Sequence, residues 1–394
     1  MKTQEKATEK KKISKKKEIK KEASKKQIEQ EKNNPSKKHN GIISFWKFMF
    51  CMMIVIYHAN VFSKAGEKVI LSKGSIGVEF FFLVSGYLMT KSALKKQNDS
   101  NYENLGKETI NFIWKKYKTF VPYTIFAGLI SIFLINLYGG GNLYKNITFI
   151  WDILLLIMTG LKGLSVNGPI WYISSMLLSM MILYPLIRRY KYNFLYIVAP
   201  LIILLGLGYL NRNFNNLRTP TMWIGFTYKG NIRAFIELLL GGILYIVCEK
   251  FKEINFTKFG KIFITVIEIL CFITPFFISQ FVTSATKYDF IVLAVISIGI
   301  IIAFSEKTLE YNFMCNKFSY WLERLSLTLY IFHFPIRLFF RNASFLKNIE
   351  YMKRLLLFIP STIIICIIIM YLMEYLKKKN YFLNKIKNLL IEQK

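Results

Sequence analysis

IISFWKFMFCMMIVIYHANVFS (residues 42–63) and SIGVEFFFLVSGYLMTKS (residues 75–92) are long apolar runs separated by a short polar connection. A run of about 20 apolar residues matches the thickness of a bilayer, and it must be helical there because only a helix satisfies its own backbone hydrogen bonds. Eight further runs of this kind lie at 119–138, 169–187, 192–210, 231–248, 261–281, 287–304, 324–341 and 353–376. The sequence therefore predicts an all-α, polytopic integral membrane protein with about ten transmembrane helices.

One more apolar run, residues 149–161, is too short to cross a bilayer, and we predict that it is a re-entrant or interfacial segment. Cytoplasmic loops of membrane proteins carry an excess of Lys and Arg. Ten spans place the basic loop 93–118, which holds six Lys, in the cytoplasm together with Arg188 and Arg189. The predicted location is the cell membrane, with both termini cytoplasmic.

The net charge of +31 would suggest nucleic-acid binding in a soluble protein. Much of this charge lies in residues 1–40, which contain 15 Lys and 6 Glu and almost no apolar residue. We predict a disordered cytoplasmic tail, and the alternative is a tether to anionic membrane lipids. Nucleic acid is not expected as a partner, because the tail lacks aromatic residues that stack on bases. The predicted organisation is this tail, a membrane domain (41–376) and a basic C-terminal tail (377–394).

The five cysteines show no CxxC spacing and mostly fall inside apolar runs, so we interpret them as core residues and expect no metal site. Ionisable residues inside spans are costly and therefore need a reason. In the first span, Lys47 and His58 are eleven residues apart, about three helical turns, and share one face. An imidazole in an apolar span suits a general base, whereas a helix-end histidine bonded to a backbone carbonyl is the alternative. For Lys47 the alternative is snorkelling to the interface.

Other spans also carry polar residues. Glu79 lies at a depth similar to that of His58 and is a candidate to orient its imidazole or hold a proton. Gly86 and its neighbour Ser85 favour close helix packing. Arg233 and Glu237 are one turn apart, and we expect them to form an ion pair. His333 lies near the middle of its span, where a packing role and a catalytic role are equally open.

Five segments of the chain resemble the acyltransferase-3 family of membrane acyltransferases, in the order in which that family has them. Residues 77–86 (GVEFFFLVSG) are similar to the family signature GVxxFFxxSG. The other four segments are residues 55–58 (VIYH) with a basic residue eleven positions before His58, 115–123 (KKYKTFVPY), 171–174 (WYIS) with Tyr184-Pro185 after it, and 326–335 (SLTLYIFHFP).

This resemblance implies transfer of an acyl group, with acetyl expected, from cytoplasmic acyl-CoA to a hydroxyl of a cell-surface or extracytoplasmic glycan. Acyl-CoA is then a co-substrate, no cofactor is tightly bound, and the glycan acceptor and the membrane lipids are the other partners. His58 matches the family's catalytic histidine, and Lys116 matches the first arginine of a motif that meets CoA. The second arginine position is Thr119, with Lys118 beside it, and Lys47 also replaces an arginine. Lysine keeps the charge for phosphate but loses the bidentate geometry.

The candidate site residues are thus His58 and Glu79 for catalysis, Lys116, Lys118 and Lys47 for the acyl-CoA, and Ser85, Trp171, Arg233 and His333 for the substrate. A transporter or flippase of a glycan or lipid-linked precursor is the alternative function, since it also requires intramembrane His, Glu and Arg. The order and specificity of the five segments favour the enzyme.

Overall fold

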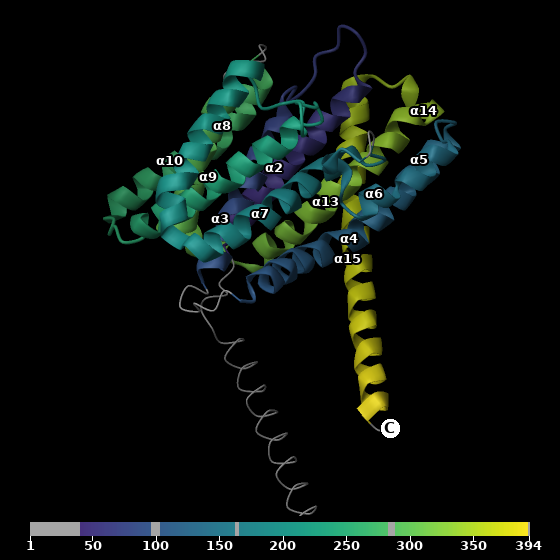
Figure 1. The fold of residues 1–394 in the computed structure, drawn as a ribbon. Helices are drawn as coiled ribbons and strands as arrows, with labels where there is room; N and C mark the ends of the chain where they lie inside the picture. Colours follow the sequence, from purple (N-terminus) through teal and green to yellow (C-terminus); the bar gives the residue numbers. More distant parts are fainter. Residues whose placement is uncertain (1–39, 96–102, 162–164, 283–287, 393–394) are drawn as a thin grey trace, which may run out of the picture. The chain divides into compact units, whose positions relative to one another are not determined.

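The computed structural model of the protein describes residues 40–95, 103–161, 165–282 and 288–392 (Figure 1). Within these ranges the chain is helical with connecting turns, and it contains no β-strand, only one isolated bridge between Trp223 and Tyr228. The all-α prediction is confirmed for this part of the chain. Apart from Asn40, the predicted Lys-rich tail lies outside the described residues, and the predicted C-terminal tail continues the last helix.

The long helices, each of 16 residues or more in the described ranges, are α2 (Gly41–Ala59), α3 (Gly77–Leu94), α4 (Leu105–Leu137), α7 (Trp171–Asn193), α8 (Ala199–Phe214), α9 (Lys229–Phe251), α10 (Lys258–Phe281), α11 (Tyr288–Ser305), α13 (Lys317–Asn342) and α15 (Tyr351–Glu392). The short ones are η2 (Asn60–Phe62), η3 (Gly74–Ile76), α5 (Leu143–Thr148), α6 (Ile150–Ile153), η4 (Ile157–Thr159), η5 (Gly168–Ile170), η6 (Phe194–Val198), α12 (Tyr311–Met314) and α14 (Ser344–Lys347).

Seven candidate spans in the described residues have the length and hydropathy of transmembrane helices. One of them, Gly168–Phe214, is 47 residues long and contains both α7 and α8. The helices α3 and α13 are not among the seven, and polar residues such as Glu79 and Lys91 lower the hydropathy of α3. The protein is therefore a multi-pass membrane protein, whereas the count of ten spans stays a prediction.

A sharp break separates α7 from α8. Lys191 has a φ of 50° and a ψ of −128°, which no helix accommodates, and the short π-helix η6 follows it. The first turns of α9 contact both the start of α7, where Arg233 lies over Trp171, and the end of α8, where Lys229 bonds Asn216. The two helices are therefore antiparallel, as two separate predicted spans require.

The short apolar run 149–161 does not form a membrane-spanning helix. It contains the four-residue helix α6 and the 3₁₀ turn η4, and the chain then turns at Gly160, whose φ is 87°. Tyr117 of α4 donates a hydrogen bond to the carbonyl of Ile153, and the buried Asp152 accepts hydrogen bonds from Ser165 Oγ at 2.6 Å and Val166 N at 2.9 Å. Because these contacts satisfy its polar groups, the segment folds against α4 at a length that suits a re-entrant element.

Glycines bring α3 and α9 into close contact. A Cβ atom on Gly86 would collide with the backbone of Leu238, and one on Gly241 would collide with the backbone at Leu83. Small residues at such positions let helix backbones approach closely within a membrane. The packing role predicted for Gly86 is confirmed.

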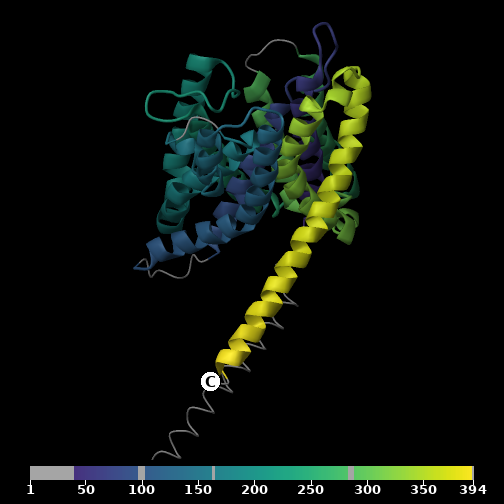
Figure 2. The same cartoon turned by 90° about the vertical axis from the view of Figure 1, so that its right-hand side faces the viewer.

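The helices α2 and α13 lie side by side and run in the same direction. Lys47 pairs with Glu323 near the start of both helices, whereas His58 faces His333 towards their other end. We call these two ends of the bundle the Lys47 end and the His58 end. Figure 2 shows α15 on the outside of the bundle, where it packs against α13.

Candidate active site

Two histidines from distant parts of the sequence meet between α2 and α13. The ring centroids of His58 and His333 are 5.1 Å apart. His333 is completely buried, His58 is half-buried, and the ring of Phe334 lies 6.3 Å from that of His58. The structure thus brings together the predicted catalytic histidine and a residue that the sequence left open between packing and chemistry.

The hydrogen bonding of His333 determines its tautomer. Its Nδ1 lies 3.0 Å from the carbonyl oxygen of Leu329, and a carbonyl only accepts hydrogen bonds, so Nδ1 carries the proton. In the neutral ring Nε2 then holds a lone pair, and this buried atom has no hydrogen-bond partner among the described residues. No hydrogen bond to the His58 ring is found there either. The pair therefore has proton-accepting capacity that the protein does not use.

Two hydrogen bonds, from Tyr330 and Asn167, hold the turn before α7 beside this pair. Tyr330 lies 6.2 Å from His333 between ring centroids and donates a hydrogen bond of 2.7 Å to the carbonyl of Pro169. Asn167 donates to the carbonyl of Ile331 at 3.0 Å. These two bonds anchor η5 to α13, so the start of α7 is positioned by the same helix that carries His333.

Glu79 lies in a different cluster from His58. Its carboxylate is 2.9 Å from Arg233, close enough for an ion pair although the two atoms are not aligned for a hydrogen bond. Arg233 also donates to Glu237 at 2.7 Å and to the carbonyl of Leu217 at 3.0 Å, and all three charged side chains are buried. The predicted pair of Arg233 and Glu237 is confirmed. The structure gives Glu79 an arginine as its partner and shows no contact with His58 among the described residues.

Trp171 and Ser85 also lie around this cluster. The guanidinium carbon of Arg233 is 5.6 Å from the ring of Trp171 and 5.8 Å from that of Phe82. Ser85 and Tyr172 share a hydrogen bond of 3.1 Å between their hydroxyl groups. Substrate binding by Trp171, Ser85 and Arg233 stays a prediction, since each has a contact within the protein that explains its position.

At the Lys47 end, opposite charges are paired. Lys47 forms an ion pair with Glu323, whose other carboxylate oxygen accepts a hydrogen bond of 2.9 Å from Ser44. The side chains of Lys47 and Glu323 remain 18% and 31% exposed. Lys116 lies within electrostatic reach of Lys47, so two of the three predicted acyl-CoA contacts are near one another.

The third predicted contact, Lys118, is separate from Lys116. Both residues belong to α4, which begins at Leu105, so the expected loop at 93–118 is helical over most of its length. Lys116 is half-buried over the ring of Phe112, and the exposed Lys118 lies over Trp114. Residues two apart on a helix do not face each other. The sequence interpretation as a loop was wrong because Lys and Glu are themselves good helix formers and extend the apolar span.

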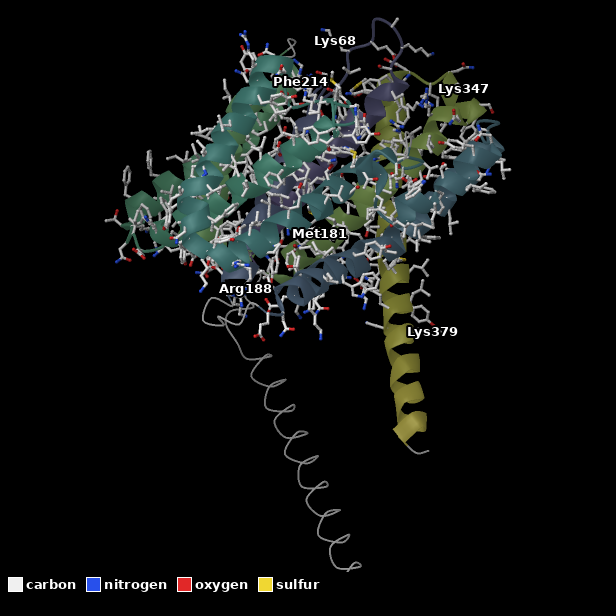
Figure 3. All side chains as sticks on the ribbon, in the orientation of Figure 1. Lys68, Met181, Arg188, Phe214, Lys347 and Lys379 are labelled. Atoms are coloured by element: carbon white, nitrogen blue, oxygen red, sulfur yellow. The ribbon has the colours of Figure 1, made fainter. Side chains whose placement is uncertain are left out.

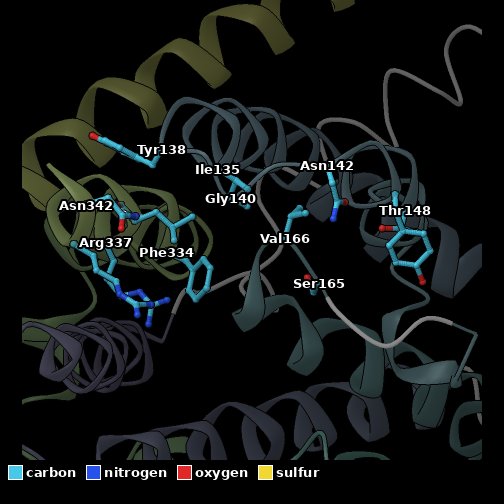
Figure 4. A pocket seen from close by; sticks show the side chains of 13 residues that line it. Ile135, Tyr138, Gly140, Asn142, Thr148, Ser165, Val166, Phe334, Arg337 and Asn342 are labelled. Carbon is cyan, nitrogen blue, oxygen red and sulfur yellow. Dashed lines mark hydrogen bonds between the residues drawn. The ribbon is translucent and has the colours of Figure 1, made fainter.

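A cavity of about 690 Å³ opens beyond the histidines at the His58 end. It lies between the ends of α4 and α13 and residues 140–148 and 165–166 (Figure 4). Phe334, whose ring contacts His58, lines it, and Arg337 lies one turn further along α13 with its guanidinium 4.1 Å from the Phe334 ring.

No group of metal-binding side chains is found in the described ranges, and all five cysteines are free, four of them buried. A family model described as an acyltransferase domain matches residues 40–374. The chain belongs to the acyltransferase-3 family. No curated protein and no solved structure shows significant similarity to it. The resemblance seen in the sequence is confirmed, and the protein is a membrane acyltransferase. This result favours the enzyme over a transporter.

Sequence reasoning missed two charged residues that lie beside the predicted site residues. Glu323, the partner of Lys47, and Arg337, beside the cavity, both lie on α13. Arg337 follows His333 by four residues, so helical spacing places it on the same face, and this signal was available in the sequence. Nothing in the sequence pairs Glu323 with Lys47, because the contact joins residues 276 positions apart.

Proposed function

We propose that this acyltransferase moves an acyl group, with acetyl the expected one, from cytoplasmic acyl-CoA to a hydroxyl of an extracytoplasmic glycan. The observation that carries the proposal is the His58–His333 pair, which has unused hydrogen-bonding capacity and lies beside a cavity with arginines in its lining. Acyl transfer to a hydroxyl requires a base at the point where the hydroxyl enters, and imidazole is the side chain best suited to that step near neutral pH.

The proposed orientation places the Lys47 end in the cytoplasm. Lys47, Lys116 and Arg188 lie towards that end, where Arg188 of α7 bonds Glu108 at the start of α4. Figure 3 shows Arg188 and Lys379 at this side of the bundle, opposite Lys68 and Lys347. Cationic residues favour the cytoplasmic side and can bind the phosphates of CoA.

One buried polar contact joins α2 and α13 between their two ends. Cys51 donates a 3.3 Å hydrogen bond to the carbonyl of Ser326, between the Lys47–Glu323 pair and Tyr330. The eleven residues from Lys47 to His58 correspond to about 16 Å of helix. An extended pantetheine arm has a comparable length, so this proposal requires the arm to pass between α2 and α13 while the CoA phosphates stay near Lys47 and Lys116.

Two mechanisms fit the geometry. In the first, an unprotonated nitrogen of His58 accepts the proton of the acceptor hydroxyl, and the hydroxyl oxygen attacks the thioester carbonyl. The carbon–sulfur bond then breaks, the thiolate takes the proton from His58, and an ester and free CoA result. In the second, His58 attacks the thioester itself, CoA leaves, and the acyl-imidazole passes the acyl group to the hydroxyl. In both, the lone pair on Nε2 of His333 can hold a proton beside His58.

The test uses the full-length protein in lipid nanodiscs with radiolabelled acetyl-CoA and surface glycan from cells that lack the gene. Wild-type protein should place label in base-labile esters on the glycan. His58→Ala should lower this rate by about 10²–10⁴-fold, the typical contribution of a general base. Met52→Leu, a conservative change on the half-buried part of the same helix, is the matched control.

Protein amounts are normalised by the folded fraction in size-exclusion chromatography. Near-normal transfer by His58→Ala contradicts the assignment of this histidine. A gene deletion that lowers the amount of surface glycan, without changing its ester content, contradicts the acyltransfer to glycan and favours transport.

A further inference from the structure

The cavity at the His58 end has a strongly one-sided charge. Its lining includes Arg337 and Arg341, one turn apart on α13, and no Asp or Glu from the part of the chain that the structure describes. Neither arginine forms an ion pair or a hydrogen bond with any residue that the structure describes. Like charges one turn apart on a helix repel each other. Arg337 is half-buried and Arg341 is exposed, so the described lining carries positive charge with no carboxylate beside it.

The Arg337 side chain packs against the ring of Phe334. Its guanidinium stacks over Phe334 at 4.1 Å, and its Nε is buried with no hydrogen-bond partner among the described residues. Figure 4 shows the Arg337 side chain beside Phe334 at the cavity wall. A guanidinium presents its N–H groups as a planar fork that matches the two oxygens of a carboxylate or phosphate. The unused Nε–H is one half of such a fork.

Asp152 is not part of the cavity lining, and its two oxygens accept hydrogen bonds from Ser165 Oγ and Val166 N. The rest of the lining supplies aromatic rings and amides, with Tyr138, Tyr144 and Asn342 among them. Aromatic rings and amides can bind the ring faces and hydroxyls of a sugar, whereas arginines bind an anionic group.

We propose that the cavity binds the acceptor through an oxyanion, so that the acceptor is an anionic glycan whose carboxylate or phosphate contacts Arg337 and Arg341. This inference rests on the proposed function and specifies its acceptor. The anion lies on the far side of Phe334 from His58, and a hydroxyl on a neighbouring part of the glycan reaches the histidine pair. Arg337 and Arg341 act in this proposal as binding residues.

The test measures binding to the full-length protein in nanodiscs of zwitterionic lipid by isothermal titration calorimetry. The probes are trigalacturonate, maltotriose carrying one phosphate, and neutral maltotriose. At low ionic strength, wild-type protein should bind one or both anionic probes at least about tenfold more tightly than maltotriose, and added salt should reduce the difference. Preference for trigalacturonate indicates a uronate, and preference for the phosphorylated probe indicates a phosphorylated glycan.

The decisive variant is the double substitution Arg337→Gln with Arg341→Gln, which should abolish the preference for the anionic probes. Its matched control is Lys68→Gln with Lys347→Gln, which removes two exposed charges from the same end of the bundle but outside the cavity, and which should keep the preference (Figure 3). Equal binding of all probes by wild-type protein, or a preserved preference in the arginine variant, overturns the proposal.

Two further outcomes separate this inference from its alternatives. If anionic phospholipid in the nanodisc displaces trigalacturonate, the cavity binds a lipid headgroup and the proposal is wrong. If the anion preference holds while no glycan is acylated, the cavity is an anionic-glycan site and the proposed function fails.

Discussion

Two buried polar clusters of this acyltransferase differ in how completely they are paired. In the first, Arg233 contacts Glu79, Glu237 and a backbone carbonyl, so its charge is compensated within the protein. In the second, His58 and His333 face each other, and one ring nitrogen of His333 is buried without a partner. Both contain residues that the sequence marked as functional.

This difference in pairing suggests that one cluster has a structural role and the other a catalytic role. A buried ion triad needs its own partners, since losing one leaves an uncompensated charge, and it has little capacity left for a substrate. Three atoms of this triad (Glu79 Oε2, Arg233 Nη2 and Glu237 Oε2) also lack a hydrogen bond, but they lie within a set of opposite charges, whereas Nε2 of His333 has neither a hydrogen bond nor an ion pair among the described residues. We infer that the Arg233 cluster holds α3 and α9 together and that the histidine pair meets the reactants.

The largest effect is expected for Arg233→Met. This change leaves Glu79 and Glu237 buried without their cation and should destabilise the protein by about 3–5 kcal/mol. Thermal unfolding in nanodiscs and the yield of folded protein measure it. The control is Arg212→Met on the exposed end of α8. A stable Arg233→Met variant that has lost only acceptor binding would support the role in substrate binding predicted from the sequence.

The next effect is expected for His333→Phe, which keeps a ring in the buried position but removes Nε2. We expect turnover to fall by roughly 10²-fold, the lower end of the range for acid–base groups, while the folded yield changes little. The measurement is transfer of labelled acetyl groups per folded molecule, with Phe332→Leu on the same helix as control for packing. Unchanged turnover with a lower yield would make His333 a packing residue.

A smaller effect is expected for Glu79→Gln. Arg233 keeps Glu237 as its partner, so the loss should be about 1–3 kcal/mol of stability, with most of the activity per folded molecule preserved. Thermal unfolding and the transfer assay are carried out on the same preparation. Loss of activity at full stability would restore Glu79 as the catalytic carboxylate that the sequence predicted.

The smallest effect is expected at the Lys47 end. The pair of Lys47 and Glu323 is partly exposed, so a double-mutant cycle should give a coupling of about 0.2–1 kcal/mol. Glu323→Gln also frees Lys47 for a phosphate and should lower the KM for acyl-CoA by up to about fivefold, the factor that corresponds to 1 kcal/mol. Gln at 323 keeps the bond to Ser44, which makes the change specific to charge. A raised KM would show that Glu323 orders the donor site.

The sequence alone determined the helical architecture, and it identified His58 as the catalytic candidate. The length of an apolar run, the charge of a loop and the five family segments are local properties of the sequence. Each can be recognised without knowing which residues contact one another in the folded protein. The pair of Arg233 and Glu237 was also predictable, because one helical turn fixes which side chains are adjacent. The helical start of α4 was missed because the prediction identified helices by their apolar runs, and this part of α4 is rich in charged residues.

Only the tertiary structure decided which groups meet. Depth in the membrane follows from position along a helix, and on that basis Glu79 and His58 were expected to interact. The direction in which each residue faces depends on how the helices pack, and this turns Glu79 to Arg233 and His58 to His333. The contacts that define the site join α2 to α13 and α3 to α9, which are far apart in sequence, so only the packed bundle separates a compensated charge from an unpaired histidine.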